Sequence, residues 1–346
     1  MLVKSLLGCY LVYVLAAGVW VVASGRVRDR AGTELLNVSY DPTRELWREL
    51  NGRFVDRFEG EKGVRLTIRQ SHGGSGSQAR AVIDGLEADV VTLAMHSDTD
   101  AIRRAGLIEP GWEERLPNRS LPYLSTIVFV VRKGNPQGVR DWPDLTRPGV
   151  RIITPNPKTS GNGKWAFLAA WGSVIHSGGT EAAAMDFVRR VYARVPVLDT
   201  GARAATMTFA QKGIGDVHLT WENEAHLEVQ ESGGGLEIVY PPASVRAEPH
   251  VALVDASVRR KGTRPAAEAY LRFLYTPEAQ EVFALHYYRP TDESVGAGHR
   301  DRFPAIDLFP ATILAPTWDE IDGRFFAEGA AFDQILAEGH SGGGRP

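Results

Sequence analysis

The sequence predicts an α/β protein of two lobes, each built on a mostly parallel sheet flanked by helices. Strand-like and helix-like segments alternate along most of the chain, and short Gly- or Ser-rich turns join several of them. The 346 residues exceed the usual length of one hydrophobic core, so chain length favours about two domains. A content of 43% hydrophobic and 23% charged residues is that of an ordinary globular protein.

The first 24 residues predict an export signal or a membrane anchor. Lys4 precedes an apolar run from Leu6 to Ala23, close to the ~20 residues that span a bilayer, so both readings stay open. Both place the rest of the chain outside the cytoplasm, in the periplasm or an equivalent compartment. The only cysteine, Cys9, precedes most of the apolar run and does not fit a lipoprotein signal, so we expect no disulfide in the exported part.

The first lobe is expected to open in β-α-β-α-β order. Leu46, Leu50, Phe54 and Phe58 recur at a spacing of four and form one apolar helical face. In this order the strands run parallel, and the ligand crevice lies beyond their carboxyl ends. The predicted strands are residues 35–40, 64–68 and 89–94, and the predicted helices are 46–58 and 78–86.

A β-branched run at 126–131 opens the second lobe. Its further strands are predicted at 150–154, 216–221 and 236–240, and its helices at 164–176, 180–192 and 204–212. A strand at 251–254 and helices at 265–275 and 277–288 return to the first lobe. The expected division is therefore 34–122 plus 246–338 for the first lobe, 123–245 for the second, and a disordered Gly-rich tail at 339–346.

Four turns place small or polar residues directly before a predicted helix. They lie at 39–42, where Asp41 can cap the helix, and at 72–77, 154–163 and 199–203. Each helix start leaves backbone N–H groups unpaired, and the helix dipole adds a partial positive charge there. One such turn is ordinary turn chemistry, whereas two in each lobe that face one cleft predict an anion site.

Charge and histidine patterns argue against several other classes of protein. The 39 basic and 42 acidic residues are mixed along the chain, so no basic stripe indicates nucleic acid as a partner. The nine histidines show no metal-ligand spacing, and we expect no metal and no other cofactor.

The alternative is a secreted serine hydrolase that uses Ser75 or Ser160. Residues 73–77 resemble the nucleophile elbow G-x-S-x-G, but Ser77 stands where the last glycine belongs. The segment 161–165 likewise lacks the flanking residues of a nucleotide phosphate loop. We therefore expect a binding protein rather than an enzyme, and hydrolysis of an activated ester would distinguish the two.

The chain resembles the periplasmic sulfate-binding protein family from about Leu35 to near Ile335. The motifs that carry the resemblance are Asn37-Val38-Ser39-Tyr40-Asp41-Pro42-Thr43-Arg44-Glu45, 70–76, 153–161, Gly201-Ala202-Arg203 and Trp221-Glu222-Asn223-Glu224. The resemblance implies a two-lobed periplasmic binding protein of type II with its ligand in the interlobe cleft. It also implies a monomer that delivers sulfate to an ABC-type permease with cytoplasmic ATPase subunits.

The resemblance implies a site made of hydrogen-bond donors alone. The matching positions give backbone N–H groups from Asp41, Ser75, Gly161, Asn162 and Ala202, the hydroxyl of Ser160 and the indole N–H of Trp221. The family usually has glycine at the position of Asn162, and a backbone contact there survives the change. By position alone Trp221 is a core residue. Arg203 is implied to lie behind the site, paired with a carboxylate at Asp98.

A donor-only site suits sulfate, which near neutral pH carries no proton and offers only acceptors. Phosphate keeps a proton at that pH, and a buried O–H group without an acceptor costs ~1–3 kcal/mol. Thiosulfate is also a tetrahedral dianion, so the choice between sulfate and thiosulfate stays open. Molybdate is less expected, because the proteins that bind it carry different motifs.

Overall fold

The computed structural model describes residues 32–341 and contains two four-stranded sheets. The first sheet has the order β10 (His250–Leu253), β3 (Val90–Leu93), β1 (Thr33–Tyr40) and β2 (Leu66–Gly73). β1 is parallel to both β2 and β3, and β10 is antiparallel to β3. The three parallel strands follow the predicted order, and the carboxyl ends of β1 and β2 lie at one edge.

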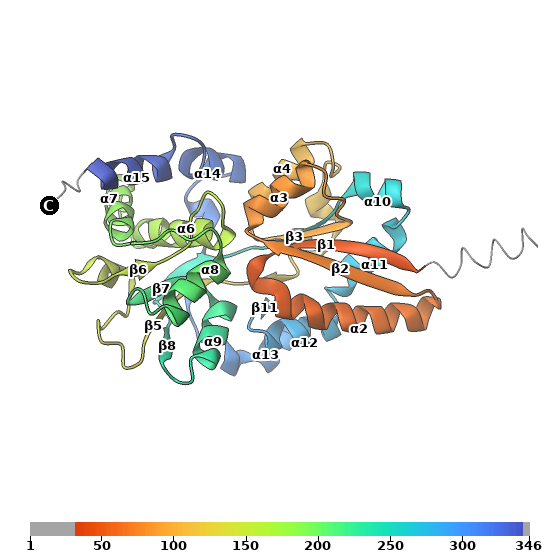
Figure 1. The fold of residues 1–346 in the computed structure, drawn as a ribbon, viewed down its shortest axis with the longest axis horizontal. Helices are drawn as coiled ribbons and strands as arrows, with labels where there is room; N and C mark the ends of the chain where they lie inside the picture. Colours follow the sequence, from red (N-terminus) through yellow and green to blue (C-terminus); the bar gives the residue numbers. More distant parts are fainter. Residues whose placement is uncertain (1–31, 342–346) are drawn as a thin grey trace, which may run out of the picture.

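Helices cover both faces of the first sheet (Figure 1). On one face α2 (Arg44–Lys62), α11 (Arg264–Phe273) and α12 (Pro277–Leu285) pack against Leu35, with Leu46 and Leu50 in the same core. The other face carries α3 (Ser75–Ile83) and α4 (His96–Arg104). α10 (Asp255–Lys261) places Val258 in the core of the first face. The apolar side of α2 is the one that the spacing of four predicts, whereas polar α4 was not predicted.

The second sheet has the order β6 (Ile152–Ile153), β7 (Val217–Trp221), β5 (Ile127–Arg132) and β8 (Leu236–Val239). β6 is parallel to β7, but β5 is antiparallel to both β7 and β8. The prediction of a mostly parallel sheet is therefore wrong here. The reason is that β5 starts where the chain enters this lobe, opposite Trp221, where β7 ends.

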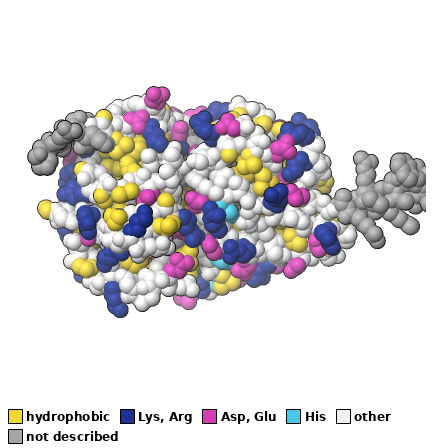
Figure 2. Space-filling model, viewed as in Figure 1, with side chains coloured by type: hydrophobic (Ala, Val, Ile, Leu, Met, Phe, Trp, Pro, Cys, Tyr) yellow, Lys and Arg dark blue, Asp and Glu magenta, His cyan; other side chains and the backbone are white. Residues whose placement is uncertain are grey.

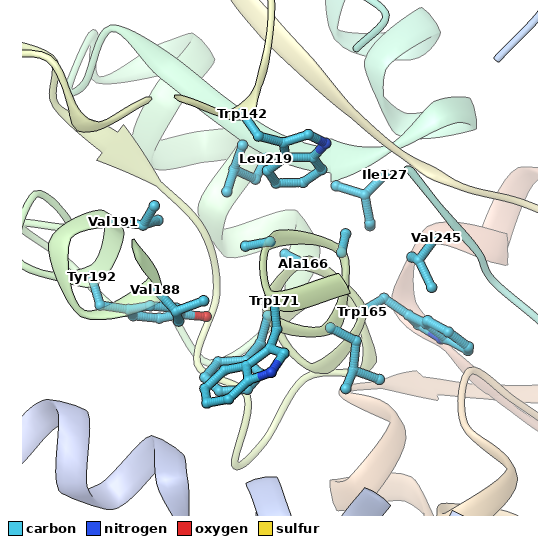
Figure 3. Packing of buried hydrophobic residues seen from close by; sticks show 14 of the residues in the cluster. Ile127, Trp142, Trp165, Ala166, Trp171, Val188, Val191, Tyr192, Leu219 and Val245 are labelled. Atoms are coloured by element: carbon cyan, nitrogen blue, oxygen red, sulfur yellow. The ribbon is translucent and has the colours of Figure 1, made fainter. Parts of the chain in front are cut away.

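The second sheet is packed against α6 (Gly161–His176), α7 (Glu181–Tyr192), α8 (Ala202–Thr206) and α9 (Glu222–Glu231). Figure 3 shows the core between sheet and helices, where Trp142 and Leu219 face the helix that carries Trp165 and Trp171. Trp165 and Trp171 are both buried in this core and are packing residues.

The C-terminal segment lies against the second lobe, although the sequence predicted 246–338 in the first. β12 (Asp307–Pro310) pairs with β9 (Ala243–Arg246), and α14 (Trp318–Phe325) and α15 (Ala331–Ser341) lie over α6 and α7 (Figure 1). The rings of Phe325 and Phe332 pack around Phe167 of α6. The apolar face of a helix predicts that the helix packs against another surface of the protein. The sequence pattern does not predict which lobe provides that surface.

The two lobes are joined by neighbouring crossings. Ser125 and Ala247 form an antiparallel bridge, with N···O distances of 3.0 and 2.9 Å. Next to it β4 (Tyr123–Leu124) pairs with β11 (Arg289–Pro290), and a third crossing follows α13 (Glu293–Gly298) on the way to β12. The remaining short elements are η1 (Asp41–Thr43), η2 (Trp112–Arg115), α5 (Pro117–Ser120), η3 (Trp142–Thr146), η4 (Met207–Gln211), η5 (Arg300–Arg302) and η6 (Ala311–Ile313).

Within residues 32–341 no helix is both long and apolar enough to cross a membrane. The predicted export signal or anchor at 1–24 lies outside the described residues. Of the predicted tail at 339–346, residues 339–341 belong to α15, and 342–346 lie outside the described residues.

Candidate anion site between the lobes

Four helices begin at the junction of the two lobes. η1 starts at Asp41 directly after β1, and α3 starts at Ser75 after β2. From the second lobe come the starts of α6 at Gly161 and α8 at Ala202. Each start presents first-turn N–H groups without an intrahelical partner.

Glycines let these four starts approach closely across the lobes. A Cβ at Gly74, before α3, would overlap the carbonyl oxygen of Thr159, before α6. One at Gly161 would overlap the Cβ of Ala94, and one at Gly201 would lie 2.7 Å from an Asp41 carboxylate oxygen. The structure thus gathers the four predicted turns in one place.

The gathered residues are shielded from solvent. Ser75 and Trp221 are 0% exposed, Asn162 1%, Ala202 2% and Ser160 3%. Because these residues come from both lobes, such burial requires the lobes to be closed on one another. Hydrogen bonds in this interior are less screened than at the surface.

The second lobe contributes Ser160, Asn162 and Trp221. Ser160 is the N-cap of α6, and its Oγ accepts from the Gly163 N–H at 3.4 Å, which leaves the hydroxyl proton free to donate elsewhere. The Asn162 Nδ2 donates to the carbonyl oxygen of Leu219 at 3.1 Å. The Trp221 Nε1 is buried and has no hydrogen-bond partner among the described residues.

The first lobe contributes Ser75 and Asp41. The Ser75 Oγ accepts a hydrogen bond from the Ala94 N–H at 3.1 Å, which fixes the start of α3 against the segment after β3. The backbone N–H of Ser75 belongs to the first turn of α3. Asp41 pairs with Arg44 at 3.0 Å. The predicted helix cap by Asp41 is wrong, because Asp41 is itself the first residue of η1 and the N-cap position is held by Tyr40.

A charged group flanks the site on the side of α8. Arg203 approaches Glu45 of the other lobe at 2.6 Å and Glu224 at 3.1 Å, the latter not aligned for a hydrogen bond. Burial raises the pKa of Glu224 to about 8, even though Arg203 acts to lower it. Burial alone would lower the pKa of Arg203, but Glu224 and Glu45 outweigh it and raise that pKa.

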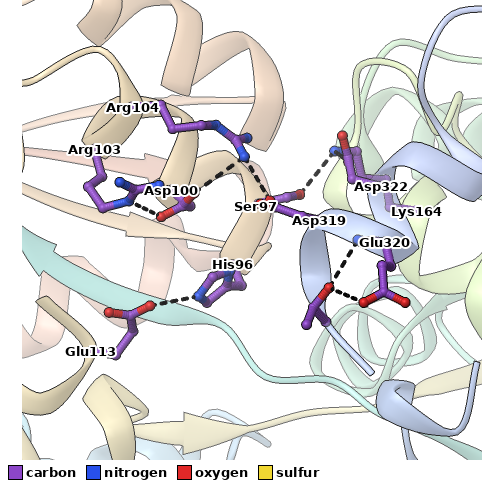
Figure 4. Close-up of polar contacts among 11 residues, drawn as sticks. His96, Ser97, Asp100, Arg103, Arg104, Glu113, Lys164, Asp319, Glu320 and Asp322 are labelled. Carbon is purple, nitrogen blue, oxygen red and sulfur yellow. Dashed lines mark hydrogen bonds and ion pairs between the residues drawn. The ribbon is translucent and has the colours of Figure 1, made fainter. Parts of the chain in front are cut away.

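A second charged group flanks the site on the side of α6 (Figure 4). Lys164 lies 3.2 Å from Asp98 of the first lobe and 3.2 Å from Asp322 of α14. Burial lowers the pKa of Lys164, but the two carboxylates outweigh it and hold the pKa above its ordinary value. The implied pair of Arg203 with Asp98 is not formed here: Arg203 pairs with Glu45 beside α8, whereas Asp98 pairs with Lys164 beside α6.

Sequence reasoning missed Lys164, Glu45 and Gly74 as parts of this arrangement. A signal for Lys164 exists, because a cation in the first turn of a helix opposes the helix dipole and calls for a carboxylate nearby. The glycine before Ser75 is a weaker signal, since glycine is common in any turn.

The two serines of the hydrolase alternative bond to backbone N–H groups, and within residues 32–341 neither hydroxyl is hydrogen-bonded to a histidine. The described part of the chain also holds no cluster of three or more His, Cys, Asp or Glu suited to a metal ion. Figure 2 shows Lys/Arg and Asp/Glu interspersed over the face it displays, with no continuous basic stripe there.

Comparisons with known proteins agree on one family. Residues 48–289 match the family described as bacterial extracellular solute-binding protein. The sulfate-binding protein of Escherichia coli K12 is 52% identical over 304 residues, 87% of this chain and 92% of its own length. The thiosulfate-binding protein of Pseudomonas aeruginosa is 49% identical over 309 residues, 89% of this chain and 93% of its own length.

A solved structure shows the same likeness in three dimensions. The sulfate-binding protein SubI from Mycobacterium tuberculosis H37Rv superposes with a TM-score of 0.77 at 33% sequence identity, covering 85% of this chain and 99% of that protein. The chain therefore belongs to the bacterial extracellular solute-binding proteins, and among them to the sulfate-binding protein family.

Proposed function

We propose that this protein captures sulfate in the closed cleft and delivers it to an ABC-type permease. The single observation that carries the proposal is the indole N–H of Trp221, fully buried and without a partner within residues 32–341. A buried donor left unpaired costs ~1–3 kcal/mol, which a bound acceptor removes. The names of the relatives at 52% and 49% identity, sulfate- and thiosulfate-binding protein, support the same ligand class.

The proposed contacts come from seven residues on both lobes. They are the backbone N–H groups of Asp41, Ser75, Gly161, Asn162 and Ala202, the hydroxyl of Ser160 and the Trp221 indole. All are donors, and helix starts favour negative charge through their dipoles. Since the donors come from both lobes, binding one anion favours the closed state.

No cationic side chain is needed in contact with the anion. Arg203 and Lys164 flank the site, but Lys164 is paired with two carboxylates and Arg203 with Glu45, beside the buried Glu224. Within residues 32–341 the Asp41 carboxylate pairs with Arg44 through one oxygen, and a site that offers the phosphate proton no acceptor selects against phosphate.

The proposal also covers where the protein acts and which membrane proteins receive the anion. The N-terminal segment exports the chain to the periplasm or an equivalent compartment, where it acts as a monomer. The closed form is recognised by the membrane subunits of the permease, whose ATPase subunits are cytoplasmic. Capture and delivery involve no catalytic step.

Titration calorimetry with sulfate, thiosulfate, molybdate and phosphate tests the ligand. The expected result is tight binding of sulfate, with negligible binding of phosphate and weak binding of molybdate. The thiosulfate arm decides between the two dianions. Phosphate binding as tight as sulfate would overturn the donor-only site.

Two substitutions test the site assignment. Ser160→Ala and Trp221→Phe each remove one donor to a charged acceptor, and each is expected to weaken sulfate binding by about tenfold or more. Trp142→Phe is the matched control, because the Trp142 indole donates to Ala243 at 2.8 Å in the core of the same lobe. Sulfate affinity unchanged in both site variants would remove the assignment.

A further inference from the structure

The Asn162 side chain links two segments of the proposed site. Asn162 is the second residue of α6 and is 1% exposed. Its Nδ2 donates to the carbonyl oxygen of Leu219 in β7 at 3.1 Å, across 57 residues of sequence. One residue therefore offers its own first-turn N–H at the start of α6 and holds the neighbouring strand with its side chain.

The hydrogen bond from Asn162 to Leu219 lies just beyond the point where the pairing of β7 with β6 ends. β6 pairs with β7 only through Ile152 and Ile153, and the last pair is Ile153 with His218. Leu219 is the next residue of β7, so it lies beyond the β6 ladder. On its other side it still pairs with Phe129 of β5. The Asn162 amide thus supplies a donor to β7 just past the end of β6.

Trp221 follows Leu219 by two residues and ends β7. Residues two apart in a strand point to the same face, about 6.6 Å along the chain. Holding the Leu219 carbonyl therefore restricts where the Trp221 indole lies relative to the start of α6. Across the lobes, the indole ring packs against Tyr40 at 5.5 Å between ring centroids.

We propose that Asn162 is a positioning residue, whose side-chain amide sets the separation between the backbone donors of α6 and the indole N–H of Trp221. This inference rests on the proposed function. A small rigid anion bonds well to several donors only when their spacing matches it, because hydrogen bonds weaken steeply away from their preferred geometry. Donors held in place before binding also lose less freedom when the anion arrives.

A double-mutant cycle tests the inference. Asn162→Ala keeps the backbone N–H and removes the amide, and it is expected to weaken sulfate binding about fivefold, as for the loss of one hydrogen bond. In the Trp221→Phe background, the same change is expected to alter affinity by less than about twofold, because the indole donor on which it acts is absent. Calorimetric titration of the four proteins with sulfate gives the cycle.

Additive losses, or no loss in Asn162→Ala, would overturn the inference. Thermal unfolding of each variant separates positioning from general stability, with Asn51→Ala as matched control. Asn51 is a buried asparagine of the first lobe, 8% exposed, whose Oδ1 accepts from the Tyr270 hydroxyl at 2.6 Å. Asn51→Ala is expected to lower the Tm while leaving sulfate affinity unchanged.

Two outcomes keep the inference distinct from the proposed function. A wild-type protein that does not bind sulfate overturns the proposed function and this inference with it. A wild-type protein that binds sulfate, with additive losses in the cycle, overturns the inference alone. Asn162→Ser, too short to reach Leu219 in the same way, takes the place of Asn162→Ala in the cycle if the alanine variant does not fold.

Discussion

The centre and the flanks of the lobe interface are built on different physical principles. At the centre, Gly74 and Gly161 bring backbone against the other lobe with no room for a Cβ, and Gly201 lies against the Asp41 carboxylate. At the flanks, Arg203 and Lys164 reach carboxylates of the first lobe. The difference suggests that the helix starts at the centre determine which anion fits. The ion pairs of Arg203 and Lys164 at the flanks hold the two lobes together.

The largest effect is expected from closing the space at the centre. Gly74 has φ −59° and ψ 137°, which alanine adopts without strain, so Gly74→Ala acts only through the overlap of its Cβ with Thr159 of the other lobe. We expect the lobes to be held apart and sulfate affinity, measured by calorimetry, to fall by about 100-fold, an overpacking cost of ~3 kcal/mol.

Gly52→Ala is the matched control for this change. Gly52 is exposed on the outer side of α2, and nothing lies within 4 Å of an added Cβ. This variant should gain up to ~1 kcal/mol of stability from helix propensity and bind sulfate as the wild type does. Wild-type affinity in Gly74→Ala would show that the centre tolerates separation of the lobes.

The next largest effect is expected on the pH dependence of stability, through Glu224 beside Arg203 of α8. Burial raises its pKa from 4.5 to about 8, so the folded state holds a proton that the unfolded state has released. The free energy of unfolding should therefore fall as pH rises toward 8, by up to about 1.4 kcal/mol per pH unit. Burial lowers the pKa of His226 to about 4, so above pH 6.5 this side chain is neutral in both states.

Glu224→Gln checks that slope. Denaturant unfolding at several pH values between 6.5 and 8 is expected to show a decline in the wild type that is largely absent in the variant. The same decline in both proteins would mean that Glu224 is not the titrating group.

The smallest effect is expected from the exposed part of the same flank. Arg203 and Glu45 are 27% and 39% exposed, and solvent-screened pairs contribute ~0.2–1 kcal/mol. In Glu45→Ala the rate of sulfate release, followed by stopped-flow mixing, should rise by about threefold, and less at high salt.

Glu49→Ala on the same helix is the control for Glu45→Ala. Glu49 pairs with Arg53 and His286 within the first lobe only. It should leave the release rate unchanged. An equal effect of both substitutions would point to the net charge of α2 rather than to the contact between lobes.

The sequence patterns that correctly predicted structure involve residues close together in the chain. The spacing of four in α2 buries Leu46, Leu50 and Phe54 as predicted, and the Gly- and Ser-rich turns do precede helices. α4 was missed because His96-Ser97-Asp98-Thr99-Asp100 reads as polar surface, yet Ser97 to Asp100 are buried, with Asp98 held by Lys164. Polar residues that are buried because they are paired leave no apolar periodicity to find.

What the sequence alone determined is the set of helix starts after strands, the two-lobed α/β class and, through its motifs, the resemblance to one family. Only the tertiary structure decided which carboxylate faces Arg203, on which lobe the C-terminal helices pack, and that Asn162 reaches Leu219. Backbone preferences and apolar spacing act between residues near in sequence, whereas the partner of a charge or an apolar face is chosen among residues that folding brings together from far apart.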